Sequence, residues 1–278
     1  MQRSEFLALT GGALLAPSAA STGEGPQGRT FLPKLATAPY PHAGRPYTDS
    51  TVGIYVPARY RADDSIDYVV HFHGWRNDVR EVFERYRLRE QLDASGRNAI
   101  LVVPQGPKDA PDSDFGKLER DRNGFARLIA QIGEFLREQS ITSAQRTGRI
   151  VLSSHSGGYG GQGGVLERGG LNDLVSDVLL FDAAYGYYGA YADWVKARSG
   201  NHLLSLFTTD TENGNVYLMS LVQAPQPNLF VRTAHGMTLS ELQTRAPTFV
   251  LTTVAHDELL QRYNWYSLFL QATALTAP

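Results

Sequence analysis

Short runs of apolar residues alternate along the chain with segments of helical periodicity. The apolar runs predict strands over 51–56, 67–73, 98–103, 150–152, 177–182, 203–208 and 248–254. One-sided apolar faces predict helices over 81–92, 123–138 and about 258–270, the second with Asn123 as its cap. Strands that are apolar at nearly every position are buried on both faces. The pattern therefore predicts an α/β protein whose mostly parallel sheet is covered by helices on both faces.

The domain organisation follows from length and composition. With 278 residues and 42% hydrophobic content, the chain can form one large domain. Residues 23–48 are rich in Pro, Gly, Thr and Ala and predict an extended lead-in to a domain over 49–278. A net charge of −2 does not favour a nucleic-acid partner. The absence of cysteine excludes disulfides, thiolate metal ligands and a cysteine nucleophile.

Residues 1–22 have the features of an export signal. Arg3 is followed by a short apolar run over 6–16, and Ser18 and Ala20 provide small residues for cleavage. The segment around Arg3 is one arginine short of a twin-arginine motif, and a buried N-terminal helix is the alternative. The run is too short to span a bilayer, and no other apolar run reaches 18 residues. We expect a periplasmic or extracellular protein with no stable membrane span after signal removal.

The most informative residue is Ser156, in the segment Ser154-His155-Ser156-Gly157-Gly158. An apolar strand precedes this segment, and a Gly-rich stretch that can open a helix follows it. A serine on such a tight strand-to-helix turn is a nucleophile elbow, G-x-S-x-G, with Ser in place of the first Gly. A plain tight turn is the alternative interpretation.

Phosphate-binding loops also combine glycines with a strand, so they are an alternative interpretation of this segment. No lysine follows the glycines, which excludes a P-loop. Gly158, Gly160 and Gly163 match the letters G-x-G-x-x-G, but they begin six residues after the strand and would lie in the following helix. This placement does not favour a dinucleotide site.

A second motif is His71-Phe-His73-Gly74-Trp75, which directly follows an apolar run. Gly74 would let the backbone approach a substrate closely. Two histidines at this spacing on a strand would point to the same side, so a metal site with Asp78 as a third ligand is a rival hypothesis. The zinc hydrolase pattern H-x-H-x-D-H is not met, so we predict no metal.

The two motifs, followed by Val254-Ala-His256-Asp, together resemble the α/β-hydrolase family over roughly residues 50–275. The resemblance implies a mostly parallel sheet of about eight strands. No large cap domain fits, since only about 20 residues separate Asp182 from the next strand. The resemblance also implies acyl transfer without a cofactor, through a Ser-Asp-His triad. We expect a serine hydrolase that cleaves an ester or amide. A carboxylesterase is favoured over an amidase, peptidase or acyltransferase.

The resemblance also implies the partners of Ser156. His256 follows the last predicted strand and is the expected base, with His235 as the fallback. Asp182 and Asp210 each end a predicted strand, and either could be the acid that orients the base. We favour Asp182, because Asp210 lies in a loop rich in Thr, Asn and Gly, where turn-forming aspartates are common.

Backbone N–H groups of Gly157 and Trp75 would form the oxyanion hole. The residues expected to line a substrate pocket are His73, Gly74, His155 and Tyr185. The expected substrate is a small-molecule or cell-envelope acyl compound. A catalytically silent binding protein of the cell envelope with the same fold is the alternative function.

Overall fold

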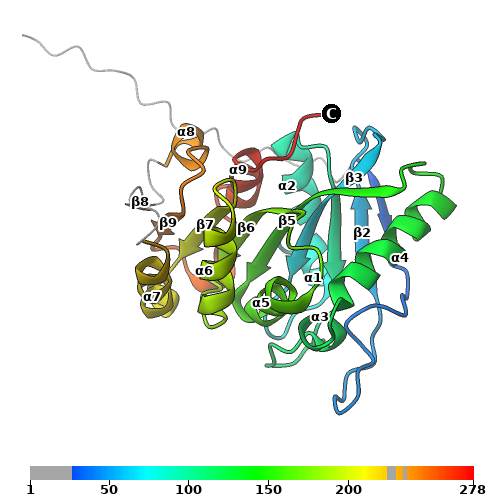
Figure 1. The fold of residues 1–278 in the computed structure, drawn as a ribbon, viewed down its shortest axis with the longest axis horizontal. Coiled ribbons are helices and arrows are strands. Elements are labelled where there is room, and N and C mark those ends of the chain that lie inside the picture. Colours follow the sequence, from blue (N-terminus) through cyan, green and yellow to red (C-terminus); the bar gives the residue numbers. More distant parts are fainter. Residues whose placement is uncertain (1–26, 224–229, 234–236) are drawn as a thin grey trace, which may run out of the picture.

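The computed structural model describes residues 27–223, 230–233 and 237–278, so the expected export signal lies outside the described residues. Within these residues a nine-stranded sheet has the order β1-β2-β4-β3-β5-β6-β7-β9-β8 (Figure 1). The strands are β1 (Arg29–Phe31), β2 (Val52–Val56), β3 (Ser65–Phe72), β4 (Ile100–Pro104), β5 (Arg146–His155), β6 (Val175–Phe181), β7 (His202–Phe207), β8 (Phe230–Thr233) and β9 (Thr248–Leu251).

The sheet is parallel from β4 to β8, and at one edge β2 runs antiparallel to both of its neighbours, β1 and β4. The predicted fold class is therefore confirmed. The added edge strand β1 comes from the segment that we expected to be an extended lead-in. Leu35, Ala38 and Tyr40 of the same segment are buried, so part of it packs onto the domain.

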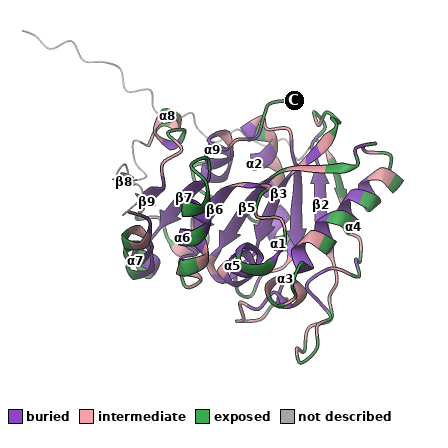
Figure 2. Ribbon diagram, in the orientation of Figure 1, coloured by how far each residue is buried: buried purple, intermediate pink, exposed green. Residues whose placement is uncertain are grey.

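Helices cover both faces of the sheet. They are α1 (Val79–Glu84), α2 (Leu88–Ser95), α3 (Gly116–Arg120), α4 (Gly124–Glu138), α5 (Tyr159–Arg168), α6 (Tyr188–Ala197), α7 (Glu212–Gln223), α8 (Leu239–Leu242) and α9 (Trp265–Gln271). Apolar side chains of α3 to α7 form the core on one face, and those of α1, α2, α8 and α9 form it on the other. Figure 2 shows the buried sheet between helices whose outer sides are exposed. Across the described ranges, we find no helix that combines the length and apolarity needed to cross a bilayer.

Three predicted helices differ from the structure in their bounds or their caps. The helix expected over 81–92 is two helices, because Arg87 between them adopts a left-handed backbone with φ 54°. This break lets α1 contact β4 while α2 packs on α9. Asn123 precedes α4 with φ 58° and makes no side-chain cap. The last helix begins only at Trp265, after the short 3₁₀ turn η3 (His256–Glu258).

The parallel strands bring their carboxyl ends to one edge of the sheet, where α/β proteins bind their ligands. The loop after β3 carries Gly74 and Trp75, and Ser156 follows β5. Asp182 follows β6 directly, and the 3₁₀ turn η2 (Thr209–Thr211) follows β7. His256 lies five residues beyond the end of β9. All the segments singled out from the sequence therefore leave the same edge.

The glycines of α5 serve close packing. A methyl group at Gly160 would lie 2.1 Å from the Ser113 carbonyl oxygen, and one at Gly163 would lie 2.2 Å from the Tyr187 ring. Gly161 is similarly close to the ring of Phe115. Of the three glycines that match G-x-G-x-x-G, Gly160 and Gly163 lie in α5 as expected, whereas Gly158 lies in the 3₁₀ turn that precedes it.

We predict that Gly160→Ala lowers the free energy of unfolding by about 1–3 kcal/mol, because its Cβ would collide with fixed backbone. Gly189→Ala on the exposed side of α6 is the matched control, since a Cβ there meets nothing within 4 Å. Urea denaturation of both variants measures the difference. An unchanged midpoint for Gly160→Ala would contradict the packing role of α5.

Candidate active site

Ser156 occupies a strained turn between β5 and α5. Its φ of 52° lies in the left-handed region, which residues other than glycine rarely adopt. The 3₁₀ turn η1 (Ser156–Gly158) starts at this residue and leads directly into α5. Ser156 is half-buried, whereas both residues before it are buried. This strand–turn–helix geometry is that of a nucleophile elbow.

Serine replaces glycine at the first small position of the elbow without loss of packing. Ser154 is fully buried, and its hydroxyl donates a hydrogen bond to Oε1 of Gln162 in α5. Gln162 in turn donates to the Leu179 carbonyl of β6, at 3.3 Å. The hydroxyl therefore ties the strand before the turn to the helix after it.

Glycines bring the loop after β3 against this turn. A Cβ at Gly74 would lie 2.9 Å from Cβ of Ser156, and one at Gly158 would lie 2.1 Å from the Phe72 carbonyl oxygen. A Cβ at Gly157 would lie 2.3 Å from Cδ1 of Trp75. Gly157 and Trp75, whose amides we expect in an oxyanion hole, are thus in direct contact.

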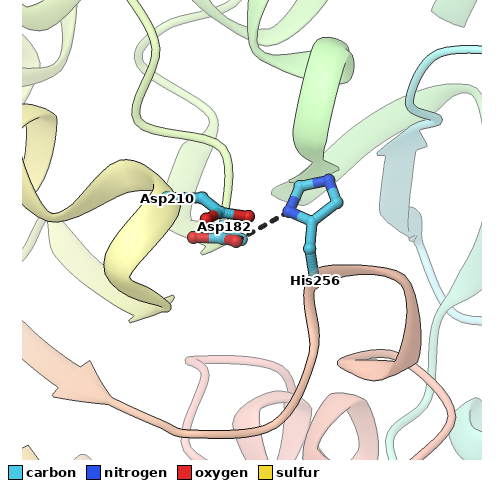
Figure 3. Close-up of side chains that lie close together, drawn as sticks. All are labelled: Asp182, Asp210 and His256. Carbon is cyan, nitrogen blue, oxygen red and sulfur yellow. Dashed lines mark hydrogen bonds and ion pairs between the residues drawn. The ribbon is translucent and has the colours of Figure 1, made fainter.

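Asp182 and His256 form a hydrogen-bonded pair. Nδ1 of His256 lies 2.7 Å from Oδ2 of Asp182 (Figure 3). Asp182 is fully buried and takes φ 49° where it leaves β6. It also accepts hydrogen bonds from the Thr208 amide at 2.9 Å, the Thr208 hydroxyl at 2.6 Å and the Thr211 hydroxyl. The carboxylate thus has one partner on the base and three on the loop after β7.

These contacts determine the protonation states of the pair. Burial alone would raise the pKa of Asp182, but the hydrogen bonds from His256 and the two threonines outweigh it and lower that pKa. Burial alone would lower the pKa of His256. The hydrogen bond and charge of Asp182, with smaller contributions from Asp257 and Asp210, raise it instead. The ionised carboxylate therefore favours a protonated imidazole, which is the state of a base that has accepted a proton.

Asp210, the other candidate acid, lies beside the same imidazole. One side-chain oxygen of Asp210, one of Asp182 and a ring nitrogen of His256 all lie within 4.8 Å of one another. Asp210 is exposed, however, and its carboxylate is not the group bonded to the ring in Figure 3. These three residues could also hold a cation, although the Asp182–His256 bond already uses two of the groups. The fallback base, His235, lies outside the described residues.

The histidines of the β3 motif face different layers of the core. The His71 ring packs edge-on against Tyr266, and its Nδ1 lies 2.8 Å from the Ser153 hydroxyl. His73 packs against Phe115, accepts from the Gly106 amide at Nε2 and donates from Nδ1 to the Gly74 carbonyl. Both nitrogens of His73 are thus bonded to the protein, so these rings do not form the metal site considered as a rival hypothesis.

The four residues expected to line a substrate pocket separate into two groups. His73, Gly74 and His155 are buried, so these residues do not form an exposed pocket surface. Tyr185 is 43% exposed, and burial together with the charges of Asp182 and Asp210 raises its pKa to about 12. Tyr185 is therefore an exposed residue within electrostatic reach of the two carboxylates.

The contacts of two sets of residues at the site were not predicted from the sequence. The hydroxyls of Thr208 and Thr211 hold Asp182, yet threonines at a strand end are common and give no distinctive signal. His155 packs against His256, and Tyr86 packs against His155. The position of His155, directly before Ser156, was the one available signal for its placement.

Comparisons with known proteins identify the fold. No family model and no curated protein sequence matches the chain. Among solved structures, the chain is similar to a mutant feruloyl esterase module from Clostridium thermocellum complexed with sinapinate. The TM-score is 0.57 and the identity 12%, over 88% of this chain and 87% of that one.

A ferulic acid esterase of the CE1 class from Anaeromyces mucronatus, in complex with ferulic acid, gives a TM-score of 0.55 at 13% identity. That match covers 92% of this chain and 95% of the other. The fluorophosphonate-binding serine hydrolase F of Staphylococcus aureus gives 0.50 at 10% identity, over 88% and 99%. The protein has the α/β-hydrolase fold, as the sequence motifs indicated.

We predict that Asp182→Asn lowers the pKa of His256 more than Asp210→Asn does, because only Asp182 combines a hydrogen bond with its charge. Titration of the imidazole signals by NMR in the native protein and both variants measures this. A larger shift in Asp210→Asn would assign the dominant charge to the later loop.

Proposed function

We propose that this protein is an esterase-like serine hydrolase that acts through an acyl-enzyme intermediate on Ser156. The observation that carries the proposal is the 2.7 Å bond between Asp182 and His256, whose ring packs against the residue preceding Ser156. Serine is a poor nucleophile unless a base removes its proton, and the base needs an acid to orient it. A carboxylate bonded to Nδ1 leaves Nε2 of His256 as the nitrogen that exchanges the proton.

In the proposed reaction, His256 takes the proton of Ser156 as its oxygen attacks the carbonyl carbon of an ester. The tetrahedral oxyanion is held by the N–H groups of Gly157 and Trp75. His256 then gives the proton to the leaving alcohol, and the acyl group remains on Ser156. Water, deprotonated by His256, releases the acid and restores the serine.

The surroundings of the site favour an acyl group with flat, apolar surface. Trp75 is 54% exposed beside Gly157, and its Nε1 donates to the Ser113 hydroxyl at 2.7 Å. Tyr185 is exposed on the side of the carboxylates. Two similar structures hold sinapinate and ferulic acid, which agrees with aromatic acyl esters as the first substrates to test.

We predict that a fluorophosphonate probe labels the folded protein and that labelling disappears in Ser156→Ala. Ser113→Ala is the matched control and retains labelling, because its hydroxyl contacts the Trp75 indole and does not lie on the elbow. Gel fluorescence with mass spectrometry of the modified peptide measures both. Unlabelled folded protein that still binds an acyl compound would favour the catalytically silent binding protein.

We predict that Asp182→Asn lowers kcat by about 10⁴-fold, the loss typical of a triad acid replaced by its amide. Asp210→Asn changes kcat by at most about fivefold, because an exposed charge contributes little.

Catalysis needs neutral His256, so the activity of the native protein falls as pH drops through the raised pKa of His256, above its ordinary value of about 6.5. Initial rates with an aryl ester between pH 5 and 9 test these expectations, and a larger loss in Asp210→Asn would move the acid to that residue.

A further inference from the structure

His155 lies between two aromatic rings beneath the site. Its ring centroid is 4.8 Å from that of His256, with the planes inclined by 32°, and 5.6 Å from that of Tyr86. Only 2% of His155 is exposed, so it does not contact bulk solvent or a substrate. It nevertheless connects the nucleophile and the base, since it directly precedes Ser156 in the chain.

The polar contact of His155 is directed at the backbone of the base. Its Nε2 lies 3.0 Å from the carbonyl oxygen of His256. A carbonyl oxygen only accepts, so Nε2 carries the proton and donates. Burial and the neighbouring His256 lower the pKa of His155 to about 4, so the ring stays neutral when His256 becomes protonated. A second positive charge beside the imidazolium is thereby avoided.

The segment that carries His256 needs such an anchor. It follows the end of β9 through residues that are largely exposed, with Thr253, Ala255 and Asp257 all on the surface. The bond to Asp182 holds the imidazole at Nδ1 and does not involve the backbone of this segment. The contact from His155 fixes that backbone directly to the residue before the nucleophile.

We infer that His155 is a positioning residue. Its hydrogen bond to the His256 carbonyl fixes the position of His256 relative to Ser156. This inference rests on the proposed function of Ser156 and His256. His155 does not touch the reacting atoms. It determines how often the base lies within proton-transfer reach of the serine, so its loss should lower kcat and leave substrate binding almost unchanged.

The test compares two amide variants of the full chain. The amide nitrogen of His155→Gln reaches the position of Nε2 and can donate to the His256 carbonyl, whereas that of His155→Asn is one carbon shorter and cannot. We expect His155→Asn to lower kcat on the order of 10- to 100-fold, the cost of a misplaced catalytic group, with KM within about threefold. His155→Gln should recover most of this loss. Thermal unfolding verifies that each variant is folded, and His155→Leu replaces the Asn variant if that one is not.

A second readout does not depend on turnover. The Nδ1 proton of His256 in its bond to Asp182 should give a far-downfield NMR signal that is sharp in the native protein and in His155→Gln, and broadened in His155→Asn. Equal kcat losses in both amide variants, or an unchanged signal in His155→Asn, would overturn the positioning role. If the native protein is neither labelled nor active, the proposed function fails, and the NMR comparison still decides the role of His155.

Discussion

The site depends on a buried carboxylate at the end of β6. Asp182 is fully buried, and removing an ionised carboxylate from water costs several kcal/mol unless hydrogen bonds replace the lost hydration. Here two threonines of the loop after β7 and the imidazole of His256 provide them. The carboxylate thereby joins the loops after β6, β7 and β9 through its hydrogen bonds.

The sheet makes this junction possible. Parallel strands place their carboxyl ends at one edge, so the loops after β5, β6, β7 and β9 meet although their residues span a hundred positions. The rest of the fold supports close approach at that edge. Glycines at 74 and 158 let the loop after β3 contact the elbow, and the glycine-rich face of α5 packs the following helix tightly behind it.

Features that leave a pattern in neighbouring residues could be predicted from the sequence. Apolar runs located the inner strands, and small residues around Ser156 located the turn. The preference for Asp182 over Asp210 rested only on the turn-rich loop around Asp210, because both residues follow strands, and in the structure both approach the same imidazole. The distinction comes from the buried position of Asp182 and from its hydrogen bonds to His256 and two threonine hydroxyls. The burial of His73 and His155 could not be predicted either, since the sequence around a histidine does not show whether its side chain faces solvent or the core. The break at Arg87 and the pairing of β1 depend on tertiary contacts rather than on periodicity.

The central claim is that Ser156, His256 and the two amides of Gly157 and Trp75 act on one carbonyl group. An experimental structure of the protein after reaction with a fluorophosphonate tests it most directly. We expect phosphorus bonded to the Ser156 oxygen, one phosphonyl oxygen within hydrogen-bond distance of both amides, and Nε2 of His256 directed at the serine oxygen. Phosphorus on another residue, or an imidazole turned away from Ser156 while still bonded to Asp182, would contradict it.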